Sequence, residues 1–251
     1  MKITRKHFLR LSGLSLLAAA GKKLAGGAGK ETPSEGAAGI RWGMVIDVKK
    51  CRQGAGCNRC ILACNLAHNI PQLPDRMHEV KWIWKEPFEA VFPYASTGYA
   101  ESENRGSLLP ALCNHCANPP CVHVCPVEAT WKREDGIVMM DWHRCIGCRY
   151  CMAACPYGAR SFNWQDPRPW VSAVNASFPT RTAGVVEKCN FCEERLAKKL
   201  PPACVEACEA KAIVFGNLND PASEAGSLLR SRFAMQREAE LGTSPSVYYI
   251  V

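Results

Sequence analysis

The chain has 251 residues, of which 47% are hydrophobic and 16 are cysteines. There are enough apolar side chains for a core, which excludes a disordered protein, and the length excludes a small disulfide scaffold. We expect one or two domains. The net charge of +8 arises largely in the first 30 residues, which hold seven basic and no acidic side chains. The remainder carries 24 basic against 23 acidic residues, interleaved, so nucleic-acid binding is not indicated.

The first residues have the layout of an export signal. A basic segment, Met1–Arg10, precedes an apolar stretch, Leu11–Ala20, which is too short to span a bilayer, and a run of small residues follows. Thr4–Arg10 resembles the twin-arginine (Tat) signal, with Lys6 in place of the second arginine. We predict a leader over residues 1–38, with a surface amphipathic helix as the alternative. No later segment has 18 uninterrupted apolar residues, so no membrane span is expected in the mature protein.

The cysteines form four groups of four, and each group ends in two cysteines separated by three residues. The groups are Cys51, Cys57, Cys60, Cys64; Cys113, Cys116, Cys121, Cys125; Cys145, Cys148, Cys151, Cys155; and Cys189, Cys192, Cys204, Cys208. With Pro156, the third group reads C-x2-C-x2-C-x3-C-P, the bacterial ferredoxin motif for [4Fe–4S] clusters. Three closely spaced cysteines can hold three corners of one cluster. We expect the fourth to open a helix and to reach a neighbouring cluster.

Three other uses of the cysteines fit this pattern less well. Zinc sites also use C-x2-C pairs, but rarely three cysteines within seven residues. Zinc is most tenable for the last group, because eleven residues separate Cys192 from Cys204. Disulfides suit an exported protein, yet cysteines three residues apart do not easily all find distant partners. Haem attachment needs C-x-x-C-H, which does not occur in the sequence.

Weaker patterns near the groups predict local structure. Val45–Asp47 and Val138–Asp141 are short apolar runs of strand type, before the first and third groups. An alanine stands four residues after the last cysteine of three groups, at Ala129, Ala159 and Ala212. We expect a short helix to pack close to a cluster at these small residues.

Other residues allow more than one interpretation. Trp82 and Trp84 alternate as on a strand with one covered face, and belong either to the core or to a partner interface. Residues 87–110 are interpreted as an insertion between the first two groups, a natural docking surface. Three histidines beside the cysteine loops are expected to be structural rather than to tune a cluster: His115, His123 and His143.

Longer strings around the cysteines resemble a known family, the four-cluster ferredoxin subunits (B subunits) of complex iron–sulfur molybdoenzymes. The strings are Leu112–Cys121, His143–Pro156, Tyr157–Trp164 and Glu187–Ala197. The resemblance extends over about residues 40–220 and implies an α+β fold of two ferredoxin-like [4Fe–4S] modules with loop insertions. We therefore predict a four-cluster domain over residues 39–220 and a C-terminal tail over residues 221–251.

In this family the first and fourth cysteine groups pair, as do the second and third, so the resemblance implies four ligand sets. The first set is Cys51, Cys57, Cys60 and Cys208; the second is Cys64, Cys189, Cys192 and Cys204; the third is Cys113, Cys116, Cys121 and Cys155; the fourth is Cys125, Cys145, Cys148 and Cys151. Five residues separate Cys51 from Cys57, so Cys51 is the least secure ligand. A three-iron cluster is the alternative in the first set.

The resemblance implies a non-catalytic electron-transfer subunit with four [4Fe–4S] clusters. Family members work with an integral membrane subunit of the NrfD type, which handles quinone. The strings and the leader are most similar to DsrO-type subunits of dissimilatory sulfur metabolism, whose partners are a DsrP-like NrfD-type membrane subunit and a DsrJ-like multihaem cytochrome c. The resemblance thus implies a periplasmic location, Tat export and membrane attachment through partner subunits.

Three alternative functions stay open. The first is the electron-transfer subunit of another NrfD-type complex (polysulfide or dimethyl sulfoxide reductase, Qrc or Hmc). The second is an enzyme with an Fe–S active site, and the third is a zinc-stabilised binding module. The sequence contains no Gly-rich nucleotide loop, Walker motif or Ser/His/Asp arrangement that would support the enzyme hypothesis.

Overall fold

A computed structural model describes residues 39–52, 56–93 and 103–251, so the predicted leader lies outside the described residues. The strands are β1 (Trp42–Asp47), β2 (Ile83–Pro87), β3 (Leu108–Leu112), β4 (Thr130–Lys132), β5 (Val138–Met140), β6 (Ser161–Phe162), β7 (Val186–Glu187), β8 (Ile213–Asn217), β9 (Ala234–Met235) and β10 (Val247–Ile250). The helices are α2 (Val48–Arg52), α3 (Arg59–His68), α4 (Phe88–Val91), α6 (Pro120–His123), α7 (Tyr150–Ala153), α8 (Glu193–Leu196), α9 (Ala203–Glu206) and α10 (Glu224–Ser231), with short 3₁₀ turns at Arg76–His78, Arg168–Trp170 and Ala239–Leu241. Among these described segments, no helix has the length and apolar character needed to cross a membrane.

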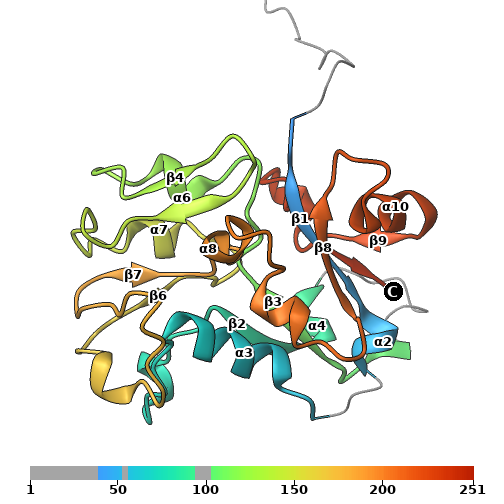
Figure 1. The fold of residues 1–251 in the computed structure, drawn as a ribbon. Coiled ribbons are helices and arrows are strands. Elements are labelled where there is room, and N and C mark those ends of the chain that lie inside the picture. The colour runs from blue at the N-terminus through green and yellow to red at the C-terminus, as the bar shows by residue number, and fades with distance from the viewer. Residues whose placement is uncertain (1–38, 53–55, 94–102) are drawn as a thin grey trace, which may run out of the picture. The chain divides into compact units, whose positions relative to one another are not determined.

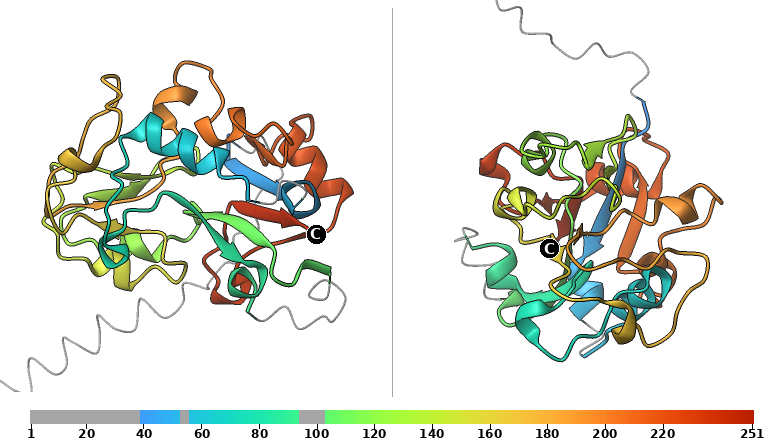
Figure 2. Two further views of the ribbon diagram at one scale, coloured as in Figure 1. Left: turned by 90° about the horizontal axis from the view of Figure 1, so that it is seen from below. Right: turned by 90° about the vertical axis from the view of Figure 1, so that its left-hand side faces the viewer.

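The largest sheet joins the two ends of the described chain. Its strand order is β8-β1-β10-β9, with β1 antiparallel to β8 and parallel to β10. Figures 1 and 2 both show β1, in blue, between the orange and red strands from the end of the chain. Residues 221–251, predicted as a tail, thus contribute α10, β9 and β10 to this region.

The described residues form three further sheets, each a two-stranded antiparallel pair: β2 with β3, β4 with β5, and β6 with β7. The predicted strand at Val45–Asp47 is confirmed as part of β1, and Val138–Asp141 is a strand, β5, as far as Met140. The short strands and short helices form the α+β, ferredoxin-like fold with loop insertions that the resemblance implies. Helix α3 packs against α9 in one module, and α6 packs against α7 in the other.

In the third group, the helix contains the third cysteine, whereas the sequence predicted that it would begin at the fourth. Helix α7 contains Cys151 and ends before Cys155, so the prediction that the last cysteine opens a helix is wrong. Helices α6 and α9 likewise contain the third cysteine of their groups, Cys121 and Cys204. After Cys155 comes Pro156, and a proline disfavours helical backbone in the residue before it.

The apolar core lies between the cysteine loops. Trp82 and Trp84 are both buried, at 1% and 7% exposure, so both belong to the core. The segment predicted as a docking insertion is partly core as well, because Phe88, Val91 and Leu109 are fully buried in the same cluster. Trp82 stacks on His68, the last residue of α3, and β2 packs against this helix, which carries Cys60 and Cys64.

Candidate metal centres

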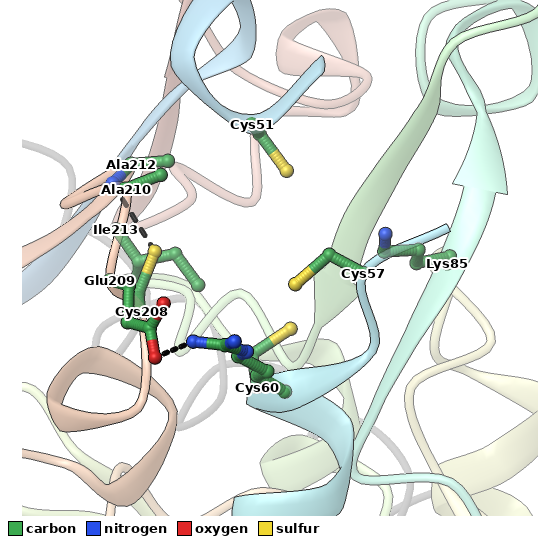
Figure 3. Close-up of a pocket in the computed structure, with 10 residues that line it drawn as sticks. Cys51, Cys57, Cys60, Lys85, Cys208, Glu209, Ala210, Ala212 and Ile213 are labelled. Carbon is green, nitrogen blue, oxygen red and sulfur yellow. Dashed lines mark hydrogen bonds and ion pairs between the residues drawn. The ribbon is translucent and has the colours of Figure 1, made fainter. Parts of the chain in front are cut away.

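The first set surrounds a cavity of about 250 Å³, which Cys51, Cys57, Cys60 and Cys208 line together (Figure 3). Strand pairing explains this meeting of distant residues. Strand β1 ends at Asp47 and β8 begins at Ile213 beside it, in antiparallel register. Cys51 follows β1 closely and Cys208 shortly precedes β8, so their side chains reach the same space. Cys51, the least secure ligand by sequence, therefore lies with its three expected partners.

Burial and neighbouring thiols govern the electrostatics of this first set. Burial first, and then the charges of Cys51 and Cys57, raise the pKa of Cys60 to about 11. Burial also raises the pKa of Cys51, against the lowering effect of the Lys85 ammonium. Cys57 is exposed, so one edge of this cavity faces solvent.

The second set is the most deeply buried. Its members are Cys64, Cys189, Cys192 and Cys204, and every one is buried. Burial raises the pKa of Cys64 well above its ordinary value, and the charges of the other three add to this rise. Two backbone donors also point at these sulfurs: the N–H of Phe191 lies 3.4 Å from Cys189 Sγ and that of Ala203 lies 3.4 Å from Cys192 Sγ.

The third set lines a small cavity of about 20 Å³. Cys113, Cys116, Cys121 and Cys155 meet there. Burial raises the pKa of Cys116 to about 12, and the charges of Cys113, Cys121 and Cys155 contribute. Strand β3 leads directly into Cys113, and α6 holds Cys121.

The fourth set lies around a smaller core, which also contains Cys121 of the third set. Cys151 is part of that core, and the less buried Cys125 and Cys145 pack against it. Cys148 is exposed, in the loop before α7. The pKa of Cys125 is lowered, because the backbone N–H groups of Val127, Thr130 and Ala129 together outweigh the effect of burial.

The repeated alanines have a different role from the predicted one. Each is buried, but none lies in a helix: Ala129, Ala159 and Ala212. Their backbone N–H groups point instead at the last cysteine of the group. The N–H of Ala129 lies 3.2 Å from Cys125 Sγ, and that of Ala212 lies 3.3 Å from Cys208 Sγ. Ala159 lowers the pKa of Cys155 in the same way.

The four sets adjoin one another in a row. Cys60 of the first set and Cys64 of the second lie one turn apart on α3. Cys113 of the third set and Cys189 of the second belong to the same buried cluster, and the charge of Cys113 raises the pKa of Cys189. The charge of Cys121 in the third set likewise raises the pKa of Cys151 in the fourth.

The three histidines singled out by sequence lie in unlike places. His115 is fully buried, stacks on Phe191 with ring centroids 3.6 Å apart, and accepts a hydrogen bond from the Val138 N–H at Nδ1. Those contacts fit the structural role expected for it. His123 and His143 are exposed.

Two residues near the cysteines escaped the sequence analysis. His68 lies one turn after Cys64 on α3. Potential metal-ligand atoms of His68, Cys192 and Glu194 all lie within 4.8 Å of one another. Burial lowers the pKa of His68, but hydrogen bonds to Cys192 and Glu194 raise it to about 9. The i, i+4 spacing from Cys64 was the available indication. Arg160, which donates to Cys121 Sγ, had no such pattern around it.

The first set fits an iron–sulfur cluster better than a zinc ion. All sixteen cysteines are free of disulfides, and thiolates are the ligands of both zinc and iron–sulfur clusters. A single zinc ion would draw four sulfurs to about 2.3 Å from one point. The first set instead surrounds a cavity of about 250 Å³, which has room for a group of several atoms.

Comparisons with known proteins agree with this chemistry. Residues 105–169, which contain the second and third cysteine groups, match the 4Fe-4S dicluster domain family. The "Hdr-like menaquinol oxidoreductase iron-sulfur subunit 1" of Archaeoglobus fulgidus is 40% identical, over 98% of this chain and 97% of the relative. The chain belongs to the [4Fe–4S] B-subunit family.

Two other relatives also align with most of the chain, and one of them is named for a menaquinone reductase. The "Menaquinone reductase, iron-sulfur cluster-binding subunit" of Nitratidesulfovibrio vulgaris is 40% identical, over 84% of this chain and 89% of the relative. "Protein NrfC" of Escherichia coli is 35% identical, over all of this chain and 96% of the relative. This family member, with its sixteen cysteines, is therefore an iron–sulfur protein of the [4Fe–4S] type.

Proposed function

We propose that this protein is a non-catalytic subunit that relays electrons through four [4Fe–4S] clusters. The ligands would be the four sets defined above, from Cys51 in the first to Cys151 in the fourth. The observation that carries this proposal is the row in which the sets adjoin, where cysteines of different groups come together. A row of redox centres is what stepwise one-electron transfer needs.

The exposure of the sets suits a relay with two ends. Exposed cysteines occur in the first and fourth sets only, at Cys57 and Cys148. The members of the second set are all buried, and those of the third are buried apart from Cys155, which is partly buried. Electrons would therefore enter and leave at the two ends, while the buried middle excludes water.

The protein's own residues would hold and tune the clusters, which supply the one-electron chemistry when bound. Backbone N–H groups aimed at sulfur, such as those of Ala129 and Ala212, stabilise negative charge on the thiolates. Burial around Cys64 and Cys189 lowers the local dielectric and strengthens these interactions.

We place the relay in a membrane complex with an NrfD-type quinone-interacting subunit. Relatives from menaquinol oxidoreductase and menaquinone reductase support the link to quinone. Within that group we favour the DsrO type, with a DsrP-like membrane subunit and a DsrJ-like multihaem cytochrome c in dissimilatory sulfur metabolism. The Tat-like segment Thr4–Arg10 supports a periplasmic location.

The second candidate is the electron-transfer subunit of another NrfD-type complex. Two relatives favour it, one named for tetrathionate reductase and one for a putative dimethyl sulfoxide reductase, at 40% and 41% identity. Purification of the complex under mild detergent distinguishes the two candidates. A c-type haem subunit supports the DsrO type, whereas a molybdopterin subunit overturns it in favour of the second candidate.

Metal analysis of the anaerobically purified protein tests the relay itself. Four clusters require about sixteen iron and about sixteen sulfide per chain, no zinc, and a spin-coupled EPR spectrum after reduction. About fifteen iron with a signal in the oxidised protein would mean a three-iron cluster in the first set. Stoichiometric zinc without iron would overturn the relay.

Export has its own test. Replacement of Arg5 and Lys6 by glutamine should leave the protein in the cytoplasm, if Thr4–Arg10 directs Tat export. The measurement is cell fractionation with periplasmic and cytoplasmic markers. Unchanged periplasmic recovery of the variant would contradict a Tat signal at this segment.

A further inference from the structure

Arg160 is a buried arginine that contacts a cysteine sulfur. Its side chain lies beside the third set with 5% of the residue exposed. The guanidinium donates from Nη2 to Cys121 Sγ at 3.0 Å and to the Thr130 hydroxyl at 2.9 Å. Its other terminal nitrogen, Nη1, lies 3.6 Å from the Met140 sulfur.

The position of the guanidinium is fixed by the β4–β5 hairpin. The Thr130 hydroxyl donates its own hydrogen to the Met139 carbonyl at 2.6 Å, so its oxygen is free to accept from Arg160. Thr130 and Met140 pair across that hairpin, and both contact the guanidinium. The arginine is therefore held in one place rather than sampling solvent.

Arg160 differs from the other buried arginines in its counter-charge. Arg181, fully buried, pairs with the Glu187 carboxylate at 2.8 Å, and Arg237 pairs with Glu86 at 3.3 Å. Within the described part of the chain, no carboxylate forms an ion pair with Arg160. A buried charge needs a partner of opposite sign.

The available negative charge comes from cysteines of two sets. Burial lowers the pKa of Arg160, but the charges of Cys121, Cys151 and Cys113 outweigh it and raise the pKa overall. Cys121 and Cys113 belong to the third set, and Cys151 belongs to the fourth. Cysteine carries this charge as the thiolate, the form that binds iron.

We propose that Arg160 is a potential-setting residue between the third and fourth sets: its fixed positive charge favours the reduced state of the clusters held there. This inference rests on the proposed function. One-electron reduction adds a negative charge to a cluster, and a nearby cation in a low-dielectric site stabilises that charge. Because Arg160 donates a hydrogen bond to Cys121 Sγ, the potential of the cluster in the third set should be affected more strongly.

A redox titration of the cluster-loaded full chain, followed by EPR, tests this role. Arg160→Met and Arg160→Gln remove the charge at similar length, whereas Arg160→Lys keeps it. The matched control is Arg144→Gln, which removes a charge next to Cys145 where the side chain is 54% exposed. Water screens the control position but not the buried one.

Both neutral variants should lower at least one midpoint potential. At the potential where that cluster is half reduced in the unmodified protein, the reduced-to-oxidised ratio should fall at least tenfold, which is about 59 mV for one electron. Arg160→Lys should keep the midpoint potential close to that of the unmodified protein. Arg144→Gln should change the reduced-to-oxidised ratio less than about twofold.

Three results would overturn the inference. The first is an unchanged iron content together with unchanged midpoint potentials in both neutral variants. This result would leave the proposed electron relay standing. The second is an equal shift in Arg160→Lys, which would assign the effect to shape. The third is loss of iron from both neutral variants but not from Arg160→Lys, which would make Arg160 a residue for holding the cluster. An unmodified protein without iron would instead refute the proposed function.

Discussion

The Glu187 carboxylate and the Arg181 guanidinium form an ion pair at 2.8 Å, in which neither side chain is exposed to solvent. Glu187 belongs to β7 and stands two residues before Cys189. Arg181 also donates to the carbonyl oxygens of His68 and Asn69, at the end of α3. The pair thus ties the helix that carries Cys64 to the strand that leads to Cys189, two halves of the second set.

Glu187→Gln should destabilise the protein strongly. The change leaves the Arg181 charge buried without its partner, and breaking such a pair costs about 3–5 kcal/mol. The Trp82 indole N–H, which donates to Glu187 at 2.9 Å, loses a charged acceptor as well. The measurement is the Tm of the purified variant together with its iron content, and both should fall.

The matched control is Asp166→Asn, because Asp166 pairs with Arg168 at 2.6 Å on the open surface. Water screens exposed pairs, so this variant should keep its Tm and its iron. Equal losses in the two variants would contradict a special role for the buried pair.

Gly147→Ala should prevent the fourth set from binding its cluster. Gly147 stands between Cys145 and Cys148 with φ +70°, and an added Cβ there would overlap the carbonyl oxygen of Gly184. Gly158 has a similar backbone, φ +62°, but open space around it. Left-handed backbone costs an alanine about 1–2 kcal/mol at either position. Gly147→Ala alone should also displace the cysteine loop.

Iron analysis separates these two glycine variants. Gly147→Ala should lose about four iron per chain, the content of one [4Fe–4S] cluster, whereas Gly158→Ala should keep its iron with a slightly lower Tm. Retention of full iron in Gly147→Ala would show that the loop adapts, and that the contact with Gly184 does not shape the fourth set.

Sequence spacing was enough to predict the chemistry and part of the framework. The motif ending in Pro156 pointed to [4Fe–4S] clusters, and the apolar runs at Val45 and Val138 are strands as predicted. Local patterns could not reveal that β10 lies beside β1, because parallel pairing over about two hundred residues leaves no periodic trace. Nor did Arg160 have a pattern, because its partners come from distant segments.

Single cysteine substitutions should group by set rather than by position in the chain. Cys60→Ser and Cys208→Ser should lose the same EPR signal and about four iron each, although these residues are far apart in sequence. Cys64→Ser should lose a different signal, shared with Cys189→Ser, although Cys64 lies one turn from Cys60. Identical spectra for Cys60→Ser and Cys64→Ser would contradict the division of α3 between two sets.

Iron uptake by the cluster-free protein should strengthen as the pH rises. Burial raises the pKa of Cys60 from its ordinary 9.0 to about 11, and that of Cys116 to about 12. Both thiols are therefore protonated at neutral pH and must release a proton to bind iron. Each such thiol adds up to about a tenfold gain in apparent affinity per pH unit between pH 7 and 9.

The same raised pKa values give the cluster-free fold an opposite trend. A thiol that stays protonated when folded stabilises the fold below pH 9.0, and this stabilisation is lost as the pH rises through about 11 for Cys60. Iron and sulfide uptake against a competing chelator, and urea unfolding of the cluster-free protein, measure the two trends. Uptake should rise from pH 7 to 9, while the unfolding midpoint should fall above pH 9. Uptake independent of pH would mean that the ligand thiols are already ionised at pH 7, contrary to their burial.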